Sequence, residues 1–221
     1  MRTKSILAAA AIIAAGAASS MAQSNVYSLN VVGYVNKPFV SGNAYIVTSP
    51  LTSGSNTLKD IIPNPPDNTV VLRWDVGAQD LSGTVPTYST ALSQWSPNPV
   101  IATGEAFLVV GAGDFTNTFV GEVRQGAITV PIAGNGNADL IGSPVPVAGN
   151  LSVILTNYPA VDNDIVLYWD VGAQDLSGTV STYSAALSSW SAGPGPVNVA
   201  DGFLLVRGGA PVNWVRNFTV Q

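Results

Sequence analysis

The sequence predicts an all-β protein made of two tandem homologous repeats of about 95 residues, each folded as a sandwich-like or barrel-like β-domain. The first observation is an internal repeat, since residues 74–96 and 169–191 align without a gap and are identical at 20 of 23 positions. The three differences are Pro86/Ser181, Thr90/Ala185 and Gln94/Ser189. A domain duplicated within one chain is the simplest explanation of this identity.

The second observation is that weaker matches flank this stretch at nearly the same offset. They pair residues 43–50 with 137–144, residues 67–72 with 162–167, and residues 104–109 with 200–205. Val-Gly-Tyr-Val at 32–35 also resembles Val-Gly-Glu-Val at 120–123, which suggests where each unit begins. We therefore expect repeat unit 1 at 23–119 and repeat unit 2 at 120–221, packed side by side, with one closed barrel built from both halves as the alternative.

The third observation is the local pattern, which alternates strand and turn signals. Short runs of β-branched and aromatic residues at 26–35, 45–48, 69–74 and 106–110 are separated by clusters of Gly, Pro, Asn and Asp. On a strand, Trp74 shares a face with Val70 and Leu72, and Trp169 stands in the same position of the second copy. Both tryptophans are expected in a core rather than on a ligand platform.

Residues 1–22 have the layout of a secretory signal peptide. Arg2 and Lys4 precede an apolar run over 6–18, and Ser20-Met21-Ala22 supplies small residues for cleavage. A membrane anchor is the alternative, but the run is too short and too rich in alanine to span a bilayer. We expect a secreted protein that is extracellular, on the cell surface or periplasmic, with no membrane span after signal removal.

Composition narrows the classes of function. Beyond residue 22 the chain carries six basic and thirteen acidic residues, a formal charge of −7, so nucleic acid is not an expected partner. The chain contains no cysteine and no histidine, which removes the usual nucleophilic triads and the common zinc sites. We expect no catalytic residue, no metal and no cofactor.

Two aromatic pairs are candidates for a binding surface. They are Tyr88 with Trp95 and, in the second copy, Tyr183 with Trp190, each expected to pair across a hairpin lined with Ser and Thr. One to two helical turns are the alternative to each hairpin, and the hairpin is preferred because Ser and Thr are poor helix formers. Flat rings surrounded by hydroxyl groups are typical of a sugar-binding surface, and exposure of the rings would support it. Ordinary cross-strand packing is the alternative and is the interpretation that we favour.

The identical stretch also contains polar positions that hydrophobic packing does not explain, among them Gln79, Asp80, Gln174 and Asp175. We expect the loops that contain them to form two like surface sites for one kind of partner. Recent duplication or gene conversion is the alternative. Paired aspartates such as Asp75 and Asp80 could bind Ca²⁺, but turns in which they accept bonds from backbone amides are favoured.

Glycoside hydrolysis is the enzyme class compatible with this composition, because it needs only two carboxylates. Beyond residue 22 the glutamates are Glu105 and Glu122. Glu105 aligns with Asp201, whereas Glu122 has no acidic counterpart. This arrangement does not favour a catalytic pair.

Several segments resemble a family of secreted β-rich proteins that is common in Verrucomicrobia and related bacteria. They are Asn-Val-Val-Gly-Tyr-Val-Asn at 30–36, the Pro-Asn-Pro-Pro run at 63–66, Trp-Asp at 74–75, Gly-Glu-Ala-Phe at 104–107 and the segment 214–221. The resemblance implies export and β-structure. No activity is established for that family, so it implies a role for no individual residue.

These observations predict a secreted, non-catalytic structural or adhesive protein of the cell exterior, with a cell-surface protein or a polysaccharide as partner. The alternative is a carbohydrate-binding module that uses the paired aromatic sites.

Overall fold

The computed structural model describes residues 30–81 and 83–220. The expected signal peptide at 1–22 lies outside these residues. Contacts divide the chain into two units, Met1–Asn30 and Val31–Gln221, and the second unit contains both repeats.

The two halves of this unit contain corresponding elements in the same order, with one exception. The first half contains β1 (Val32–Phe39), β2 (Ala44–Thr48), α2 (Leu58–Ile61), β3 (Val70–Asp75), β4 (Asp80–Leu81), β5 (Thr87–Ser89), β6 (Gln94–Ser96), β7 (Ala106–Val110) and β8 (Phe115–Glu122). The second half contains β9 (Gly126–Ile132), β10 (Ala138–Gly142), α3 (Leu151–Ile154), β11 (Ile165–Asp170), β12 (Asp175–Ser184), β13 (Ser189–Trp190), β14 (Gly202–Val206) and β15 (Val212–Phe218). The exception is that β4 and β5 of the first half correspond to the single strand β12 of the second. The prediction of an all-β chain with two tandem repeats is confirmed.

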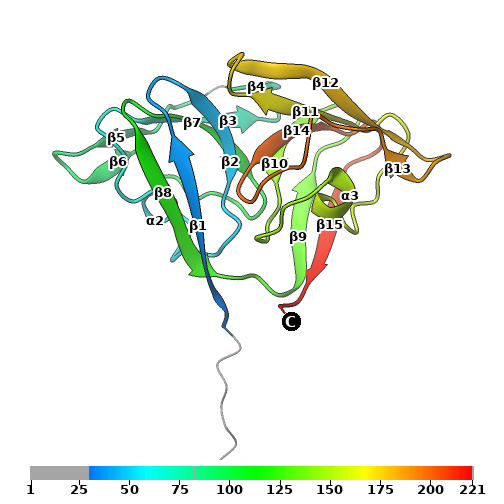
Figure 1. Ribbon diagram of the computed structural model, residues 1–221, viewed down its shortest axis with the longest axis horizontal. Helices are drawn as coiled ribbons and strands as arrows, with labels where there is room; N and C mark the ends of the chain where they lie inside the picture. Colours follow the sequence, from blue (N-terminus) through cyan, green and yellow to red (C-terminus); the bar gives the residue numbers. More distant parts are fainter. Residues whose placement is uncertain (1–29, 82, 221) are drawn as a thin grey trace, which may run out of the picture. The chain divides into compact units, whose positions relative to one another are not determined.

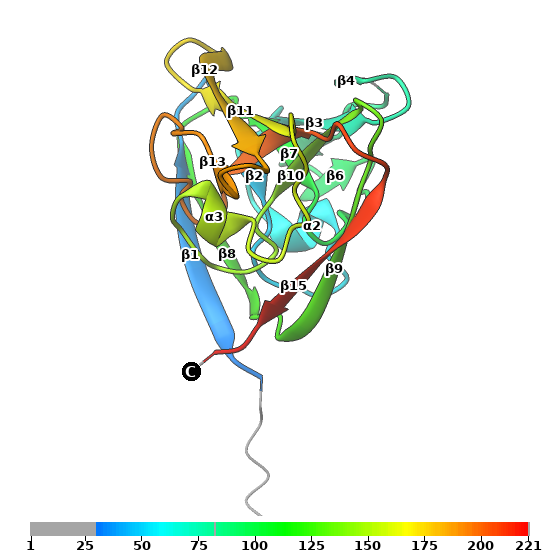
Figure 2. The same cartoon turned by 90° about the vertical axis from the view of Figure 1, so that its right-hand side faces the viewer.

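Each repeat has a main antiparallel sheet and a separate two-stranded ribbon (Figure 1). The sheet order is β2-β7-β3-β5-β6 in the first repeat, with β4 paired to β3, and β10-β14-β11-β12-β13 in the second. The ribbons are β1–β8 and β9–β15, which join the first and last strands of each repeat. Figure 2 shows β9 and β15 as such a pair.

The strand pattern explains why the central strands are buried on both faces. In β7, Phe107 and Val109 point into the core of the first repeat, whereas Ala106 and Leu108 point into a second core. This second core lies between the repeats, because it also contains Leu140 and Leu204 from the opposite half. Successive side chains of a strand point to opposite faces, so one central strand serves both cores. The repeats thus pack sheet against sheet, with a core of their own on the outer side of each sheet.

Trp74 and Trp169 are partly buried and pack against the core between the repeats, as the alternation predicted for a core position. Trp214 of β15 is fully buried in the core of the second repeat, where its indole N–H donates to the Thr156 carbonyl at 2.9 Å. Each of these three tryptophans has both an apolar contact and a partner for its N–H group.

A single helical turn contributes two buried side chains to the core of each repeat, α2 in the first repeat and α3 in the second. Thr57 caps α2 by a capping box with Asp60, and Asn150 caps α3 by accepting from the Val153 amide. The bond from the Thr57 backbone lowers the pKa of Asp60 below its usual value. Both helices have only four residues, so they are too short to leave a helical period in the sequence.

One of the three differences within the identical stretch changes the strands. Ser181 lies inside the continuous strand β12, where it pairs with Val166 of β11. Pro86 stands in the equivalent place between β4 and β5. Proline has no N–H group to donate to a ladder, which explains why the first repeat has two short strands instead of one long strand.

The strand pairing also corrects one expectation about where the repeats begin. Residues 120–123 do not mark a second start, since residues 120–122 belong to β8 and pair antiparallel with residues 32–34 of β1. The counterpart of β1 is β9, which begins at Gly126. The boundary expected at 119/120 therefore falls inside β8, and the two repeats meet at residues 123–125.

No helix in the described ranges is long and apolar enough to cross a membrane.

Candidate functional site

The loop that follows β3 reaches across to the other repeat. The Trp74 indole N–H donates to the Ala138 carbonyl at 2.8 Å, and the Gln79 Oε1 accepts from the Ala138 amide at 2.7 Å. The Gln79 Nε2 donates to the same carbonyl at 3.2 Å and to Val76 within the loop at 2.6 Å. Ala138 is the first residue of β10, an edge strand of the second sheet.

The loop that follows β11 makes the same contacts in the opposite direction. The Trp169 indole N–H donates to the Ala44 carbonyl at 2.7 Å, and the Gln174 Oε1 accepts from the Ala44 amide at 2.6 Å. Ala44 is the first residue of β2, which occupies in the first sheet the place of β10 in the second. We call the four side chains Trp74, Gln79, Trp169 and Gln174, with the two alanines that they bind, the reciprocal clasp.

The clasp gives an internal reason for the identity of the two loops. Each glutamine bonds the edge strand of the other repeat, so it has a partner within the chain. The aspartates of the loop form turns, since Asp75 accepts from the Gly77 and Ala78 amides at 2.8 and 3.0 Å, and Asp170 does the same in the second loop. These turns fit the interpretation favoured over Ca²⁺ binding. Among the described residues, no three acidic side chains cluster closely enough to hold a metal ion.

Asp80 and Asp175 are exposed on these loops. Each accepts a bond from the amide of the next residue, at 2.7 Å in both cases. The structure does not bring them together with the predicted aromatic residues into one site. Of the predicted site residues in this loop, the glutamines thus bind the opposite repeat and the aspartates lie on the surface.

The predicted aromatic hairpin of the first repeat forms, but it is buried. Tyr88 and Trp95 are opposite each other in β5 and β6, with ring centroids 5.5 Å apart in an edge-to-face arrangement. Each is 3% exposed, and the Trp95 indole N–H donates to the Ile62 carbonyl at 2.9 Å. These rings act as core residues and present no free face to a ligand.

The second aromatic hairpin has the same pairing and a more open environment. Tyr183 is opposite Trp190, with ring centroids 5.4 Å apart, and both side chains are only partly buried. Trp190 also stacks on Tyr158 at 6.4 Å. The structure therefore distinguishes two aromatic pairs that the sequence makes nearly identical.

Beside each tryptophan of the clasp lies a hollow that contains an ion pair. The hollow at Trp74 has a volume of about 230 Å³ and contains Arg73, whose Nε is 2.7 Å from Glu105. The hollow at Trp169 has a volume of about 340 Å³ and contains the pair of Lys37 with Asp201. Glu105 and Asp201, which align in sequence, thus lie in the equivalent hollows of the two repeats. Each of these carboxylates has a cationic partner.

Glu122, the other glutamate weighed for hydrolysis, is exposed at the end of β8, where its backbone pairs with Thr52.

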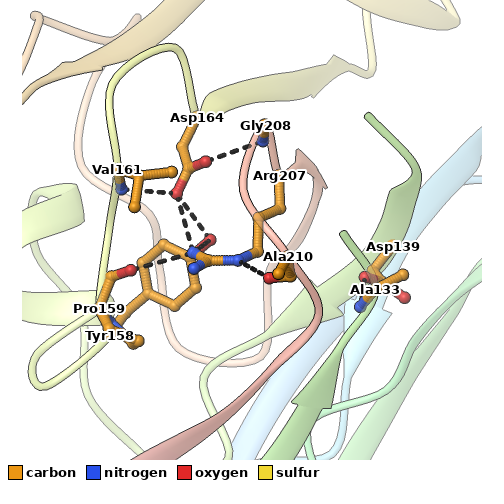
Figure 3. Close-up of polar contacts among 9 residues, drawn as sticks. All are labelled: Ala133, Asp139, Tyr158, Pro159, Val161, Asp164, Arg207, Gly208 and Ala210. Atoms are coloured by element: carbon orange, nitrogen blue, oxygen red, sulfur yellow. Dashed lines mark hydrogen bonds and ion pairs between the residues drawn. The ribbon is translucent and has the colours of Figure 1, made fainter. Parts of the chain in front are cut away.

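Two buried charges, Asp164 and Arg207, form a network in the second repeat (Figure 3). Asp164 is fully buried and accepts from the Tyr158 hydroxyl at 2.8 Å and from the Gly208 amide at 2.9 Å. The Arg207 Nη1 lies 3.3 Å from Asp164 and 3.0 Å from the Tyr158 hydroxyl. Burial raises the pKa of Tyr158, so the phenol stays protonated and can donate to the carboxylate. Every group of the network has a protein partner, which indicates a structural role.

Asp139 is a second buried carboxylate, apart from this network in Figure 3. It lies on β10 beside the hollow at Trp74, and its Oδ2 accepts from the Ala133 amide at 2.6 Å. Burial raises the pKa of this carboxyl above its usual value. Because the pKa of Asp139 is higher in the folded chain than in the unfolded chain, ionisation of this carboxyl lowers the free energy of unfolding. The loss develops as the pH rises through the folded-state pKa.

We therefore predict that Asp139→Asn, which keeps an oxygen acceptor without the charge, unfolds at a higher temperature than the parent chain at pH 7. The difference should shrink as the pH falls below about 3.9, the ordinary pKa of aspartate, where both chains are neutral at this position. Thermal unfolding of both chains from pH 3 to pH 8 measures the effect. The opposite trend, with the largest gain at acid pH, would show that the charge is stabilising.

The two hairpin tips expose leucines at equivalent positions. Leu92, between β5 and β6, is 65% exposed, and Leu187, between β12 and β13, is 76% exposed. These are the tips of the strands farthest from the clasp in each sheet order (Figure 1). Single exposed leucines are common on protein surfaces, so the informative feature here is that a highly exposed leucine recurs at equivalent positions of the two hairpins.

No family model, no curated protein and no solved structure matches this chain. Its strands and its contacts between the halves define it as an all-β protein of two tandem repeats joined by a reciprocal clasp.

Sequence reasoning missed the clasp, although one signal was present. The match of residues 43–50 with 137–144 begins at Asn-Ala in both copies, and these alanines are the ones that the clasp binds. The invariant glutamines and the invariant alanines could have been paired with each other. Nothing in a single sequence states that the partner of one repeat's loop is the other repeat.

Proposed function

We propose that the chain is a secreted, non-catalytic structural or adhesive protein of the cell exterior. The observation that supports this proposal is the pair of exposed leucine tips, Leu92 and Leu187, carried at the outer ends of two sheets that are fixed to each other by the clasp. Two like apolar contacts on one rigid body raise the strength of attachment through effective concentration, without further contacts.

The use of the carboxylates supports a non-catalytic role. Glu105 and Asp201 are held in ion pairs, Asp164 is buried in the network with Arg207, and Asp60 belongs to a helix cap. Each of these groups therefore has a structural task. Export to the cell exterior rests on the signal-like residues 1–22 and on the resemblance to secreted β-rich proteins.

The test is attachment of the labelled secreted chain to the cells and cell envelope of the producing organism. We expect Leu92→Ser or Leu187→Ser alone to weaken retention partially, and the double variant to weaken it by about tenfold or more, because the paired contacts act together. Val85→Ser is the matched control, since Val85 is 43% exposed but lies outside the tips. Retention of the double variant equal to that of the control would refute the adhesive tips.

The tip leucines are a better target than the residues singled out from the sequence. Gln79 holds the repeats together and Trp95 is a core residue, so their substitution would disturb the fold. A loss of attachment in such variants would then say nothing about a surface site.

A further inference from the structure

Trp95 and Trp190 occupy equivalent places in nearly identical hairpins, yet they differ in environment. Trp95 is 3% exposed and its indole N–H is bonded to a carbonyl. Trp190 is only partly buried, and its indole N–H has no acceptor among residues 30–81 and 83–220. A buried tryptophan N–H usually finds a partner in the fold, whereas the N–H of the partly buried Trp190 is left to solvent or to a ligand.

The segment after each tryptophan also differs between the repeats. In the first repeat, the segment 96–100 (Ser-Pro-Asn-Pro-Val) is held on α2, where Asn98 accepts from the Lys59 amide and Pro99 from the Leu58 amide. The second repeat has one residue more at 191–196 (Ser-Ala-Gly-Pro-Gly-Pro) before the equivalent contact, in which Gly149 and Val197 exchange backbone bonds. The longer segment includes two glycines, which have no side chains to cover the ring.

The two glycines of this segment have different surroundings. A Cβ atom on Gly193 would lie 2.5 Å from the Tyr168 hydroxyl oxygen, so only glycine allows the segment to approach the tyrosine so closely. A Cβ atom on Gly195 would meet nothing within 4 Å. Tyr168 in turn is fixed by the 2.8 Å bond between its hydroxyl and Ser181, the residue that replaces Pro86.

The result is a groove of about 400 Å³ on the second repeat, which we call the Trp190 groove. Its walls include Leu151, Ser152, Tyr168, Trp190, Ser191 and Gly193. Tyr168 and Gly195 also line the hollow at Trp169, so the two spaces are neighbours. None of the residues that line the Trp190 groove is charged, and all of them belong to the described chain.

We propose that the Trp190 groove binds a neutral oligosaccharide. An indole ring offers a flat apolar surface to the C–H face of a sugar ring, and its free N–H can donate to a sugar hydroxyl. The serine hydroxyls at the rim supply further donors and acceptors, and the volume falls in the range of small-molecule sites. A charged ligand would find no opposite charge in the lining.

This site goes beyond the proposed adhesive function and rests on it only for the location at the cell exterior. The sequence suggested two equivalent sugar-binding sites, and the structure leaves one candidate. In the first repeat, Trp95 is buried and the segment 96–100 is bonded to α2. The first repeat thus serves as an internal control for the second.

The experiment titrates the secreted chain with soluble neutral hexasaccharides of glucose, xylose and mannose, with sulfated and carboxylated oligosaccharides and a proline hexamer as comparison ligands, by calorimetry. We expect at least one neutral hexasaccharide to bind. Trp190→Ala should weaken that binding by about tenfold or more, since a central tryptophan carries much of such a contact. Trp190→Phe, which keeps a ring but loses the N–H, should weaken it less.

Two further variants separate the groove from the fold. Replacing residues 191–196 by the sequence of residues 96–100 should close the groove and abolish binding, with thermal unfolding showing that the chain still folds. Val215→Ala, an exposed change on β15 outside the lining of the groove, should bind the sugar like the parent chain. Binding only to the charged oligosaccharides or the proline hexamer, no binding to any neutral hexasaccharide, or undiminished binding by the replaced chain would each overturn the proposal.

The same variants are assayed for attachment to cells. If the leucine double variant loses attachment but still binds the sugar, the tips act in attachment independently of the Trp190 groove. Absence of sugar binding with intact attachment overturns the Trp190 groove alone, so failure of the two proposals can be told apart.

Discussion

Asp164→Ala should lower the free energy of unfolding by about 3–5 kcal/mol, which is the cost of leaving one member of a buried ion pair without the other. Asp164 is fully buried, and Arg207 is 6% exposed. Without the carboxylate, the guanidinium keeps only the Tyr158 hydroxyl and the carbonyls of Pro159 and Ala210 as partners. The Gly208 and Val161 amides lose their acceptor as well.

Urea unfolding of the parent and variant chains measures this loss. Asp162→Ala is the matched control, because Asp162 lies two residues away, is exposed and accepts one bond, from the Ala185 amide at 2.5 Å. We expect the control to lose about 0.5–1.5 kcal/mol, the net worth of one hydrogen bond. Equal losses in the two variants would show that the buried pair contributes nothing special.

The first repeat shows how the fold can do without this network. At the place of Asp164 it has Thr69, whose buried Oγ1 has no hydrogen-bond partner among the described residues, and at the place of Arg207 it has Gly111. The double change Asp164→Thr with Arg207→Gly should therefore cost less than the sum of its two single changes, because it removes both charges together. A double variant whose loss equals that sum would contradict the coupling.

The sequence was sufficient to predict what depends on local order and on the repeat. The alternation in 70–74 placed Val70, Leu72 and Trp74 on one face, and the hairpin pairings of Tyr88 with Trp95 and of Tyr183 with Trp190 are those of the structure. Such features follow from the period of two along a strand and from short loops. The duplication supplied the rest of the architecture, because two equal sequences fold alike.

The features that the sequence did not reveal depend on contacts between distant parts of the chain. Gln79 and Ala138 are 59 residues apart, and Ala44 and Gln174 are 130 residues apart. Identity between the two loops indicated a shared partner but could not say that the partner is the opposite repeat. The environment of Trp190 depends on the segment that follows it and on Tyr158, which lies outside the hairpin, so a comparison of the hairpins themselves gives no sign of the groove.

Removing both tryptophans of the clasp, by Trp74→Ala with Trp169→Ala, should uncouple the two repeats. Each indole fills part of the core between the sheets and bonds an alanine carbonyl of the opposite repeat. Truncating a large aromatic residue that is partly buried costs about 2–4 kcal/mol, somewhat below the 3–5 kcal/mol of a fully buried one. Both substitutions weaken the interface between the repeats, where the two indoles lie.

The cores inside the repeats do not contain these side chains. Phe107 with Phe119 in the first repeat, and Phe203 with Trp214 in the second, remain packed as before. Calorimetry should therefore show two unfolding transitions in the double variant where the parent chain shows one, since each repeat keeps its own core while the shared core is weakened. Amide exchange should rise first in β2 and β10, the edge strands that the clasp holds.

Leu92→Ala with Leu187→Ala is the matched control, because it also removes one large side chain from each repeat but leaves the interface intact. We expect this control to keep a single transition at nearly the parent temperature. If the tryptophan double variant also unfolds in one step at the parent midpoint, the clasp does not couple the repeats. In that case the identity of the two loops would require a reason outside the chain, as a surface meeting the same kind of partner would supply.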